Sequence, residues 1–302
     1  MPKLFTRPLN GIFLLNKSLG PSSNQALQSI KKILYADKAG HTGSLDPLAS
    51  GMLPICLGAA TRYAQYLLNA DKWYRAQICL GQTTDTGDRE GKIIAETPLP
   101  LLTEKEVAAV LQTFIGVQFQ CPPMYSALKH QGKPLYELAR QGIEVERSLR
   151  EIEIYAIHLI EYDVKTLTVE VHCSKGTYIR TLAEDIGKKL DCGAHLQALH
   201  RLSIEGFNRD QMTTLEQLQQ LAAKKGLSAV EALVLPMDKA LRHYPSFTVS
   251  QWWLMALRQG KQFVCTEVSP GLKRLYSNDG QFKGLVVVDD SGCVRAERLL
   301  GF

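Results

Sequence analysis

The chain has 302 residues, 45% hydrophobic and 22% charged, which excludes a disordered or fibrous protein and suits a packed core. No apolar run reaches the ~18–20 residues that would cross a bilayer. The net charge of +5 is accounted for by residues 1–45, where six basic residues, Lys3 to Lys38, accompany one acid. This distribution suits a polyanionic partner such as nucleic acid, or a solubilised helix face, and charge alone leaves both interpretations open.

The seven cysteines are odd in number and form no CxxC pair, which favours neither a disulfide framework nor a zinc knuckle. The N-terminus lacks the long apolar segment of a secretory signal. We therefore expect a cytoplasmic protein with reduced cysteines and no metal.

Capping and apolar periodicity predict the elements of the first half of the chain. Residues 11–16 predict a buried strand, and Ser22 with Gln25 forms a capping box for a helix ending near Tyr35. Residues 39–58 contain four glycines and two prolines, so we expect a loop that ends in a short strand over 53–57. The remaining predictions are a helix over 59–69, a strand over 73–80, a polar loop over 83–91 and a helix over 103–115 that begins with the capping box of Thr103 and Glu106.

The second half changes character at residues 121–150, which mix basic and aromatic residues and predict an insertion standing off the main body. A solvated hairpin and helix would give the same composition. Further predictions are paired strands over 151–161 and 166–173, a helix over 181–190, a strand over 199–204 and helices over 215–225 and 228–233. We place a domain boundary near 240–246, followed by a mainly β tail.

The stretch from Gly40 to Pro47 is the first candidate for chemistry. Pro47 biases Asp46 toward an extended backbone, and the glycines permit close approach to a ligand. Among apolar neighbours the Asp46 carboxyl would be partly desolvated, which raises its pKa unless a cation lies beside it. Arg180, at a strand-to-helix junction, could supply that cation. Taken singly, Asp46 also fits an ordinary turn residue and Arg180 a surface residue.

Motifs for other reaction classes are missing from the sequence. It contains no GxxxxGK[ST], GxGxxG, GxSxG or HExxH pattern, so nucleotide-dependent, metal-dependent and serine hydrolysis have no signal. We expect no cofactor.

Four separated motifs resemble the TruB family, the bacterial tRNA pseudouridine-55 synthases. GHTGSLDPLASGMLP is similar to the family's catalytic loop, and Lys72-Trp73-Tyr74-Arg75 to its second motif. KGTYIRTLAEDIG and CGAHLQALHRLSIEGF resemble the third and fourth, and GIFLLNKSLGPSSN the opening strand and turn. The motifs follow the family's order over residues 11 to about 240.

The resemblance implies roles for individual residues. Asp46 is the expected nucleophile or base, Arg180 its ion-pair partner, and Tyr74 the ring that stacks on the flipped uracil and removes its C5 proton. The implied substrate-binding residues are Tyr178 in the uracil pocket, Leu199 against the base, His41 in the space vacated in the RNA and Lys17 as support for the site. Whether Asp46 adds to the sugar C1′, adds to uracil C6 or removes a 2′ proton stays open.

The resemblance also implies an α+β pseudouridine synthase fold with a mixed, mainly antiparallel sheet. The expected catalytic domain spans 1–243 with a thumb-like insertion at 121–150, and a small PUA-like β-barrel spans 244–302. Lys273, Arg274, Lys283 and Arg295 could contact the acceptor-stem side of a tRNA. The expected partner is the T-stem-loop of tRNA, with no membrane and no required protein partner, and the expected state is a monomer.

Two other functions remain to be distinguished. A non-catalytic RNA-binding or RNA-folding protein could use the same groove, although it would not need Asp46, Tyr74 and Arg180 together. A pseudouridine synthase could instead act on ribosomal RNA or in a guided complex, although the compact tail and the absence of a long basic extension make guidance a poor match.

Overall fold

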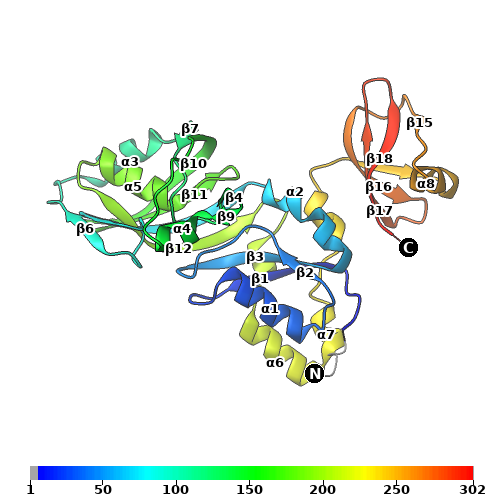
Figure 1. Ribbon diagram of the computed structural model, residues 1–302, viewed down its shortest axis with the longest axis horizontal. Coiled ribbons are helices and arrows are strands. Elements are labelled where there is room, and N and C mark those ends of the chain that lie inside the picture. The colour runs from blue at the N-terminus through cyan, green and yellow to red at the C-terminus, as the bar shows by residue number, and fades with distance from the viewer. Residues whose placement is uncertain (1–5, 302) are drawn as a thin grey trace.

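The computed structural model describes residues 6–301, so Lys3, counted above among the basic residues, lies outside them. Nine strands of this part form one mixed sheet (Figure 1). Its strand order is β13-β1-β3-β12-β4-β11-β10-β7, with β2 paired to β3. The strands are β1 (Gly11–Lys17), β2 (Ala39–His41), β3 (Ala49–Leu57), β4 (Lys72–Leu80), β7 (Gly116–Gln120), β10 (Arg150–Asp163), β11 (Thr166–Cys173), β12 (Ala194–Ile204) and β13 (Thr213–Thr214). Only the β1–β13 and β3–β12 pairs of this sheet are parallel within residues 6–301, which confirms the expected mixed, mainly antiparallel arrangement.

Helices cover one face of this sheet with their apolar sides. They are α1 (Ser23–Ile33), α3 (Glu104–Gln112), α5 (Ile179–Lys189), α6 (Leu215–Lys225) and α7 (Leu227–Glu231). The predicted capping boxes at Ser22 and Thr103 are both present and begin α1 and α3. Each satisfies two backbone N–H groups that a helix start leaves unpaired, which is why these two helix starts were readable from sequence.

Strand β1 has a core on both sides because its side chains alternate between the two faces. Phe13 and Leu15 pack in the core beneath the helices. Ile12 and Leu14 pack in a second core on the opposite face, which also contains Leu285 of the tail. The continuous apolar run that predicted a buried strand is therefore explained by burial on both faces.

Two strands are longer than predicted, β3 at its start and β12 at its start. β3 pairs with β12 at Ala49 to Gly51 and with β2 from Ile55 onward. Pro54 lies between the part of β3 that pairs with β12 and the part that pairs with β2, so its missing N–H costs no hydrogen bond to either of these strands. The predicted helix over 59–69 is instead a 3₁₀ helix (Gly58–Tyr63) followed by α2 (Ala64–Leu68).

The insertion at 121–150, which we call the thumb, contains a two-stranded hairpin and one short helix. Its elements are β8 (Lys129–His130), β9 (Lys133–Pro134) and α4 (Leu135–Arg140). Outside the thumb, the loop predicted over 83–91 connects a second hairpin, β5 (Gln82–Thr84) with β6 (Ile93–Glu96). Leu135 and Leu138 are buried. The Tyr125 carbonyl at its start accepts a hydrogen bond from Arg180, so the thumb does not stand wholly off the main body.

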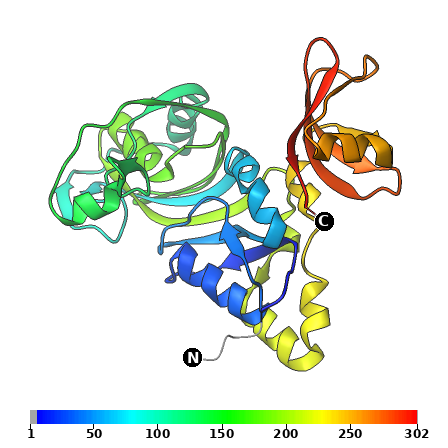
Figure 2. The same ribbon diagram turned by 45° about the vertical axis from the view of Figure 1, so that its right-hand side comes forward.

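Residues 244–302, which we call the tail, contain a five-stranded sheet in the order β14-β16-β17-β18-β15. The elements are β14 (Ser246–Val249), α8 (Gln251–Arg258), β15 (Phe263–Val264), β16 (Gly271–Ser277), β17 (Phe282–Val288) and β18 (Cys293–Leu299). This sheet forms a curled half-barrel beside α8 (Figure 2), a helix that the sequence analysis missed although Ser250 caps it.

The tail is joined to the large sheet through packing and hydrogen bonds. The Tyr63 hydroxyl donates to the Arg298 carbonyl at 3.1 Å, and Tyr63 packs edge-on against Phe282. Lys273 is buried and donates to Ser269, and Arg274 donates to the Tyr244 carbonyl. Lys273 therefore serves the tail itself and is too buried to reach RNA, whereas Arg274 is half-buried and its contact with RNA stays a prediction. Within residues 6–301 the helices are too short or too polar to traverse a bilayer.

Candidate active site

Asp46 lies in a short connection between β2 and β3, residues 42–48, which we call the Asp46 loop. The loop is fastened to the start of α1, because the Leu45 N–H donates to the Ser23 hydroxyl at 2.7 Å and that hydroxyl donates to the Leu45 carbonyl at 2.9 Å. The Gly20 N–H donates to the Pro47 carbonyl at 2.9 Å. These bonds and the packing of Leu45 and Leu48 in the core fix the loop, while the side chain of Asp46 remains 44% exposed.

Arg180 supplies the cation expected beside Asp46. Its Nη2 lies 3.2 Å from the Asp46 carboxylate, and only 7% of its side chain is exposed. Arg180 is the second residue of α5, two residues after Tyr178, at the strand-to-helix junction that the sequence predicted. The expected ion pair is therefore present, and the helix start delivers the guanidinium to the loop.

A second acid, Asp88, shares the same guanidinium and was missed from the sequence. Its carboxylate lies 3.3 Å from Arg180 Nη1 and is 5% exposed. Asp88 also accepts hydrogen bonds from the Thr86 hydroxyl at 2.7 Å and the Glu90 N–H at 3.1 Å. It belongs to the polar loop predicted over 83–91, where three acids among threonines and glycines gave no sign of which one turns inward.

The charges around Asp46 act on its protonation in opposite directions. Although one side is open, the surrounding protein desolvates the carboxyl and raises its pKa above the ordinary value. Arg180 counteracts this as the nearest cation, Asp88 raises the pKa further, and Lys17 lowers it. Among these charges, Arg180 is the one that most favours the ionised carboxylate.

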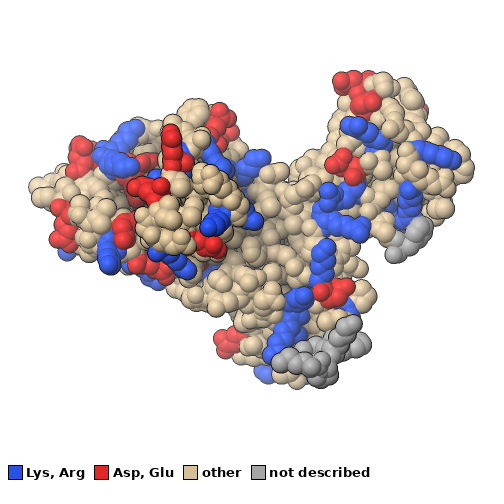
Figure 3. Space-filling view, viewed as in Figure 1, with Lys and Arg blue, Asp and Glu red and all other residues tan. Residues whose placement is uncertain are grey.

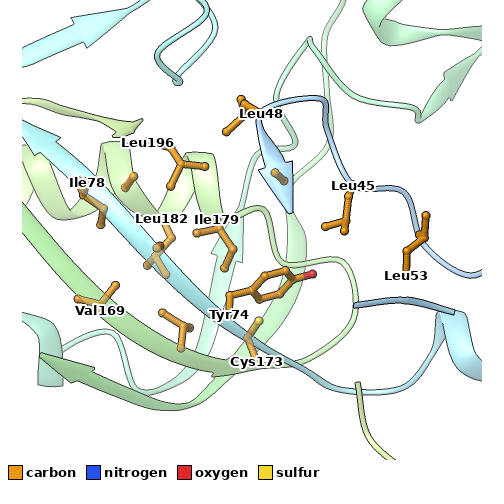
Figure 4. Close-up of a cluster of buried hydrophobic side chains, with 14 of the residues drawn as sticks. Leu45, Leu48, Leu53, Tyr74, Ile78, Val169, Cys173, Ile179, Leu182 and Leu196 are labelled. Carbon is orange, nitrogen blue, oxygen red and sulfur yellow. The ribbon is translucent and has the colours of Figure 1, made fainter. Parts of the chain in front are cut away.

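Tyr74 projects from β4 into the core beneath the Asp46 loop. It packs among Leu45, Cys173 and Ile179, and Figure 4 shows its hydroxyl pointing toward the segment that carries Leu45. Burial raises the pKa of the phenol, and a hydrogen bond and the charge of Arg201 act against that rise. The ring is 8% exposed, so its hydroxyl sits in a largely water-free position close to the loop.

Tyr178 and Leu199 reach the same region from two other elements. Tyr178 caps α5, and its N–H donates to the Gln120 side chain at 3.0 Å while its carbonyl accepts from that side chain at 3.3 Å. Leu199 on β12 is in register with Ala49 at the end of the Asp46 loop and with Ala76 on β4. Both side chains are half-buried, which leaves surface available to a ligand.

His41 and Lys17 are the last residues of β2 and β1. His41 is half-buried on β2, and burial together with Arg201 lowers its pKa. Lys17 is buried, and its Nζ donates to the carbonyls of Ser18 at 3.0 Å and Pro21 at 2.8 Å. Desolvation lowers the pKa of Lys17 to about 8. These contacts are those of a residue that shapes the turn before α1.

Two open hollows lie away from this site. A hollow of about 650 Å³ lies between α1 and the α6–α7 region, and one of about 310 Å³ lies beside Trp73 on the sheet. Neither includes Asp46. An open surface beside Asp46 suits a macromolecular substrate, from which one nucleotide must be presented, better than it suits a small molecule that is engulfed.

Comparison with known proteins places the chain in a family. Residues 31–179 match the N-terminal domain of the TruB family pseudouridylate synthases, and residues 180–242 match a tRNA pseudouridylate synthase B C-terminal domain. A protein of Coxiella burnetii named tRNA pseudouridine synthase B is 46% identical over 99% of this chain and 97% of its own length. One of the same name from Methylobacillus flagellatus is 49% identical over 99% of this chain and 97% of its own length.

Solved structures agree with this placement. A chain of a Cbf5-Nop10-Gar1 complex superposes with a TM-score of 0.75 at 26% identity, covering 99% of this chain and 90% of that one. A chain of an H/ACA RNP bound to a substrate RNA containing 2′-deoxyuridine gives a TM-score of 0.74 at 24% identity, covering 98% of this chain and 86% of that one, and shows the fold alone. With four motifs in order, relatives of nearly equal length and an acid–arginine pair at the matching loop, the chain belongs to the TruB family and is a pseudouridylate synthase.

Proposed function

We propose that this pseudouridylate synthase converts uridine 55 in the T-loop of tRNA to pseudouridine without a cofactor. The names of relatives that are 46–49% identical support tRNA as the substrate. The observation that carries the chemistry is the partly exposed Asp46 carboxylate held 3.2 Å from the buried Arg180 guanidinium. A carboxylate kept ionised at an open site can act on a nucleoside presented to it.

The reaction rearranges bonds within one nucleotide. The N1–C1′ bond breaks, the uracil turns, and a C5–C1′ bond forms, while C5 loses a proton and N1 gains one, so nothing is added or removed overall. Asp46 acts as nucleophile or base by one of three routes, through the sugar C1′, uracil C6 or the 2′ proton. Tyr74 takes the C5 proton in the last step.

Reaching C1′ requires the uridine to leave its stack. Extrusion costs a few kcal/mol and is offset by stacking in the protein and by a residue that fills the gap. Tyr74, Tyr178 and Leu199 surround the uracil in this proposal, and His41 occupies the vacated space. Their arrival from β4, the start of α5 and β12 around one loop supports this assignment. Lys17 supports the site from behind.

The rest of the tRNA would contact the thumb and the tail. Lys129, Lys133 and Arg140 of the thumb are exposed, where they can meet phosphates. Figure 3 shows further Lys and Arg side chains running from the tail toward the part of the molecule that holds α7. We assign residues 1–243 to the catalytic domain and 244–302 to an RNA-binding domain, and we propose a cytoplasmic monomer that needs no protein partner.

The test uses an unmodified tRNA transcript tritiated at uracil C5. The wild type is expected to release tritium, and Asp46→Asn to release none while binding the transcript with a similar Kd. Asp46→Asn preserves the shape of the side chain, so loss of activity with intact binding separates the enzyme from a non-catalytic RNA-binding protein. Release from a transcript with cytidine at position 55, or from ribosomal RNA alone, would contradict the proposed substrate.

A further inference from the structure

Arg201 is a second buried arginine beside the Asp46 loop; it lies within the fourth motif, but neither the resemblance nor the proposed chemistry has given it a role. It is 1% exposed and is the largest fully buried side chain among residues 6–301. No ion pair joins it to any carboxylate of that described part of the chain. An arginine without an acid partner is costly to bury unless its N–H groups are well bonded, so its contacts are informative.

The backbone of Arg201 is fixed at the centre of the large sheet. On β12 it is in register with Gly51 of β3 on one side and with Tyr74 of β4 on the other. Gly51 has a φ of +101°, and a Cβ there would lie 2.2 Å from the Arg201 carbonyl oxygen. Only glycine permits this approach, so β3 and β12 are locked together at this point.

From this fixed backbone the guanidinium joins the Asp46 loop to β3. Its Nη2 donates to the Gly43 carbonyl at 3.1 Å, just after β2, and its Nε donates to the Met52 carbonyl at 2.7 Å, within β3. Asp46 lies between these two carbonyls in the chain. Tyr74 is the register partner of Arg201 on β4, and the charge of the same guanidinium acts against the rise in the pKa of the Tyr74 phenol.

We propose that Arg201 is a positioning residue of this enzyme, whose single planar guanidinium ties the Asp46 loop to β3 and sets the position of the loop relative to Tyr74 on β4. The inference rests on the proposed roles of Asp46 and Tyr74. Because Arg201 is buried, it acts through these two groups and does not touch the RNA. A planar fork of donors can satisfy several carbonyl and hydroxyl acceptors at once, which a lysine ammonium on a flexible stem cannot do in the same geometry.

The experiment compares Arg201→Lys and Arg201→Met with Lys72→Met. Lys72 is also buried and also bonds main-chain carbonyls, those of Leu68 and Ala70, but it does not bond the Asp46 loop. Tritium release gives kcat and KM, and filter binding gives the tRNA Kd. Hydrogen exchange follows the amide of Leu45, which donates to the Ser23 hydroxyl of α1, and that of Ala49, which donates to the Asp46 carbonyl.

Arg201→Met is expected to lower kcat by about 100-fold, the size of effect that a small misplacement of reacting groups produces, with KM and Kd within about twofold. The loop amides should exchange faster. Arg201→Lys should retain more activity, about tenfold below the wild type, and Lys72→Met should keep both kcat and loop protection. If Arg201→Met does not fold, Arg201→Lys decides alone.

Three outcomes would overturn the proposal: equal losses of kcat in Arg201→Lys and Lys72→Met, wild-type loop exchange in Arg201→Lys, or a loss confined to KM. A wild type that releases no tritium from tRNA would instead reject the proposed substrate. The exchange of the loop amides would still report whether Arg201 holds the loop, so the two failures are distinguishable.

Discussion

The Asp46 loop is bordered by two buried arginines whose surroundings differ in kind. Arg180, at the start of α5, lies between two carboxylates, Asp46 and Asp88, 3.2 and 3.3 Å away. Arg201, in the second half of β12, donates its side-chain hydrogen bonds to the main-chain carbonyls of Met52 and Gly43. The first arrangement compensates charge and governs the ionisation of the exposed acid. The second has no compensating acid and governs the shape of the loop. One region therefore sets the electrostatics of the site and the other sets its geometry.

The largest effect is expected when Arg180, the cation between Asp46 and Asp88, is replaced by a neutral residue. Arg180→Met leaves the buried Asp88 without a compensating cation, so the free energy of unfolding should fall by about 3 kcal/mol. The kcat for tritium release should fall by about 1000-fold, because Asp46 loses the donor that keeps it ionised and aimed. Urea denaturation and single-turnover kinetics measure the two effects.

The double variant Arg180→Met/Asp88→Asn separates those effects. Removing the stranded charge should restore about 2 kcal/mol of stability without restoring kcat. Recovery of activity together with stability would mean that Arg180 serves the fold alone, and the contrast between the two arginines would fail.

The pH dependence of kcat distinguishes the two regions, because only changes around Arg180 should shift it. Asp46 acts as a carboxylate, so activity is lost as the pH falls through its pKa, which the desolvating surroundings raise and Arg180 lowers. Asp88→Asn removes a charge that raises this pKa, so the acid limb should move to lower pH. Arg180→Lys, which holds the carboxylate less well, should move it to higher pH.

Arg201→Lys is the control for this profile. Arg201 is not among the charges that shift the pKa of Asp46, so the acid limb of Arg201→Lys should coincide with that of the wild type. Shifts of the same sign in all three variants would show that the limb reports loop geometry and not the charge on Asp46.

A smaller effect is expected from the contact that fastens the loop to α1. Ser23→Ala removes both hydrogen bonds to the Leu45 backbone and leaves a buried N–H without its partner. The free energy of unfolding should fall by about 1–2 kcal/mol. We expect kcat to fall by about tenfold, less than for either arginine, because β2 and β3 still hold the loop ends. Ser29→Ala, on the exposed side of α1, is the matched control.

Local rules predicted much of the fold. The capping boxes at Ser22 and Thr103 act within one helical turn, so their residues alone mark where α1 and α3 begin. The alternation of apolar residues placed β4 and the β10–β11 pair within a few residues of their observed bounds. The start of β3 was missed because its pairing depends on β12, which lies about 150 residues away in the chain.

By itself, the sequence determined where chemistry would be found, because Asp46 between glycines and Pro47, and Arg180 at a helix start, are local arrangements that motifs preserve. Asp88 and Arg201 became visible only in the tertiary structure. An aspartate in a polar loop and an arginine in an apolar strand look ordinary in the chain. Whether each turns inward depends on which strands become neighbours, and the free energy of burying a charge is set by partners that are distant in sequence.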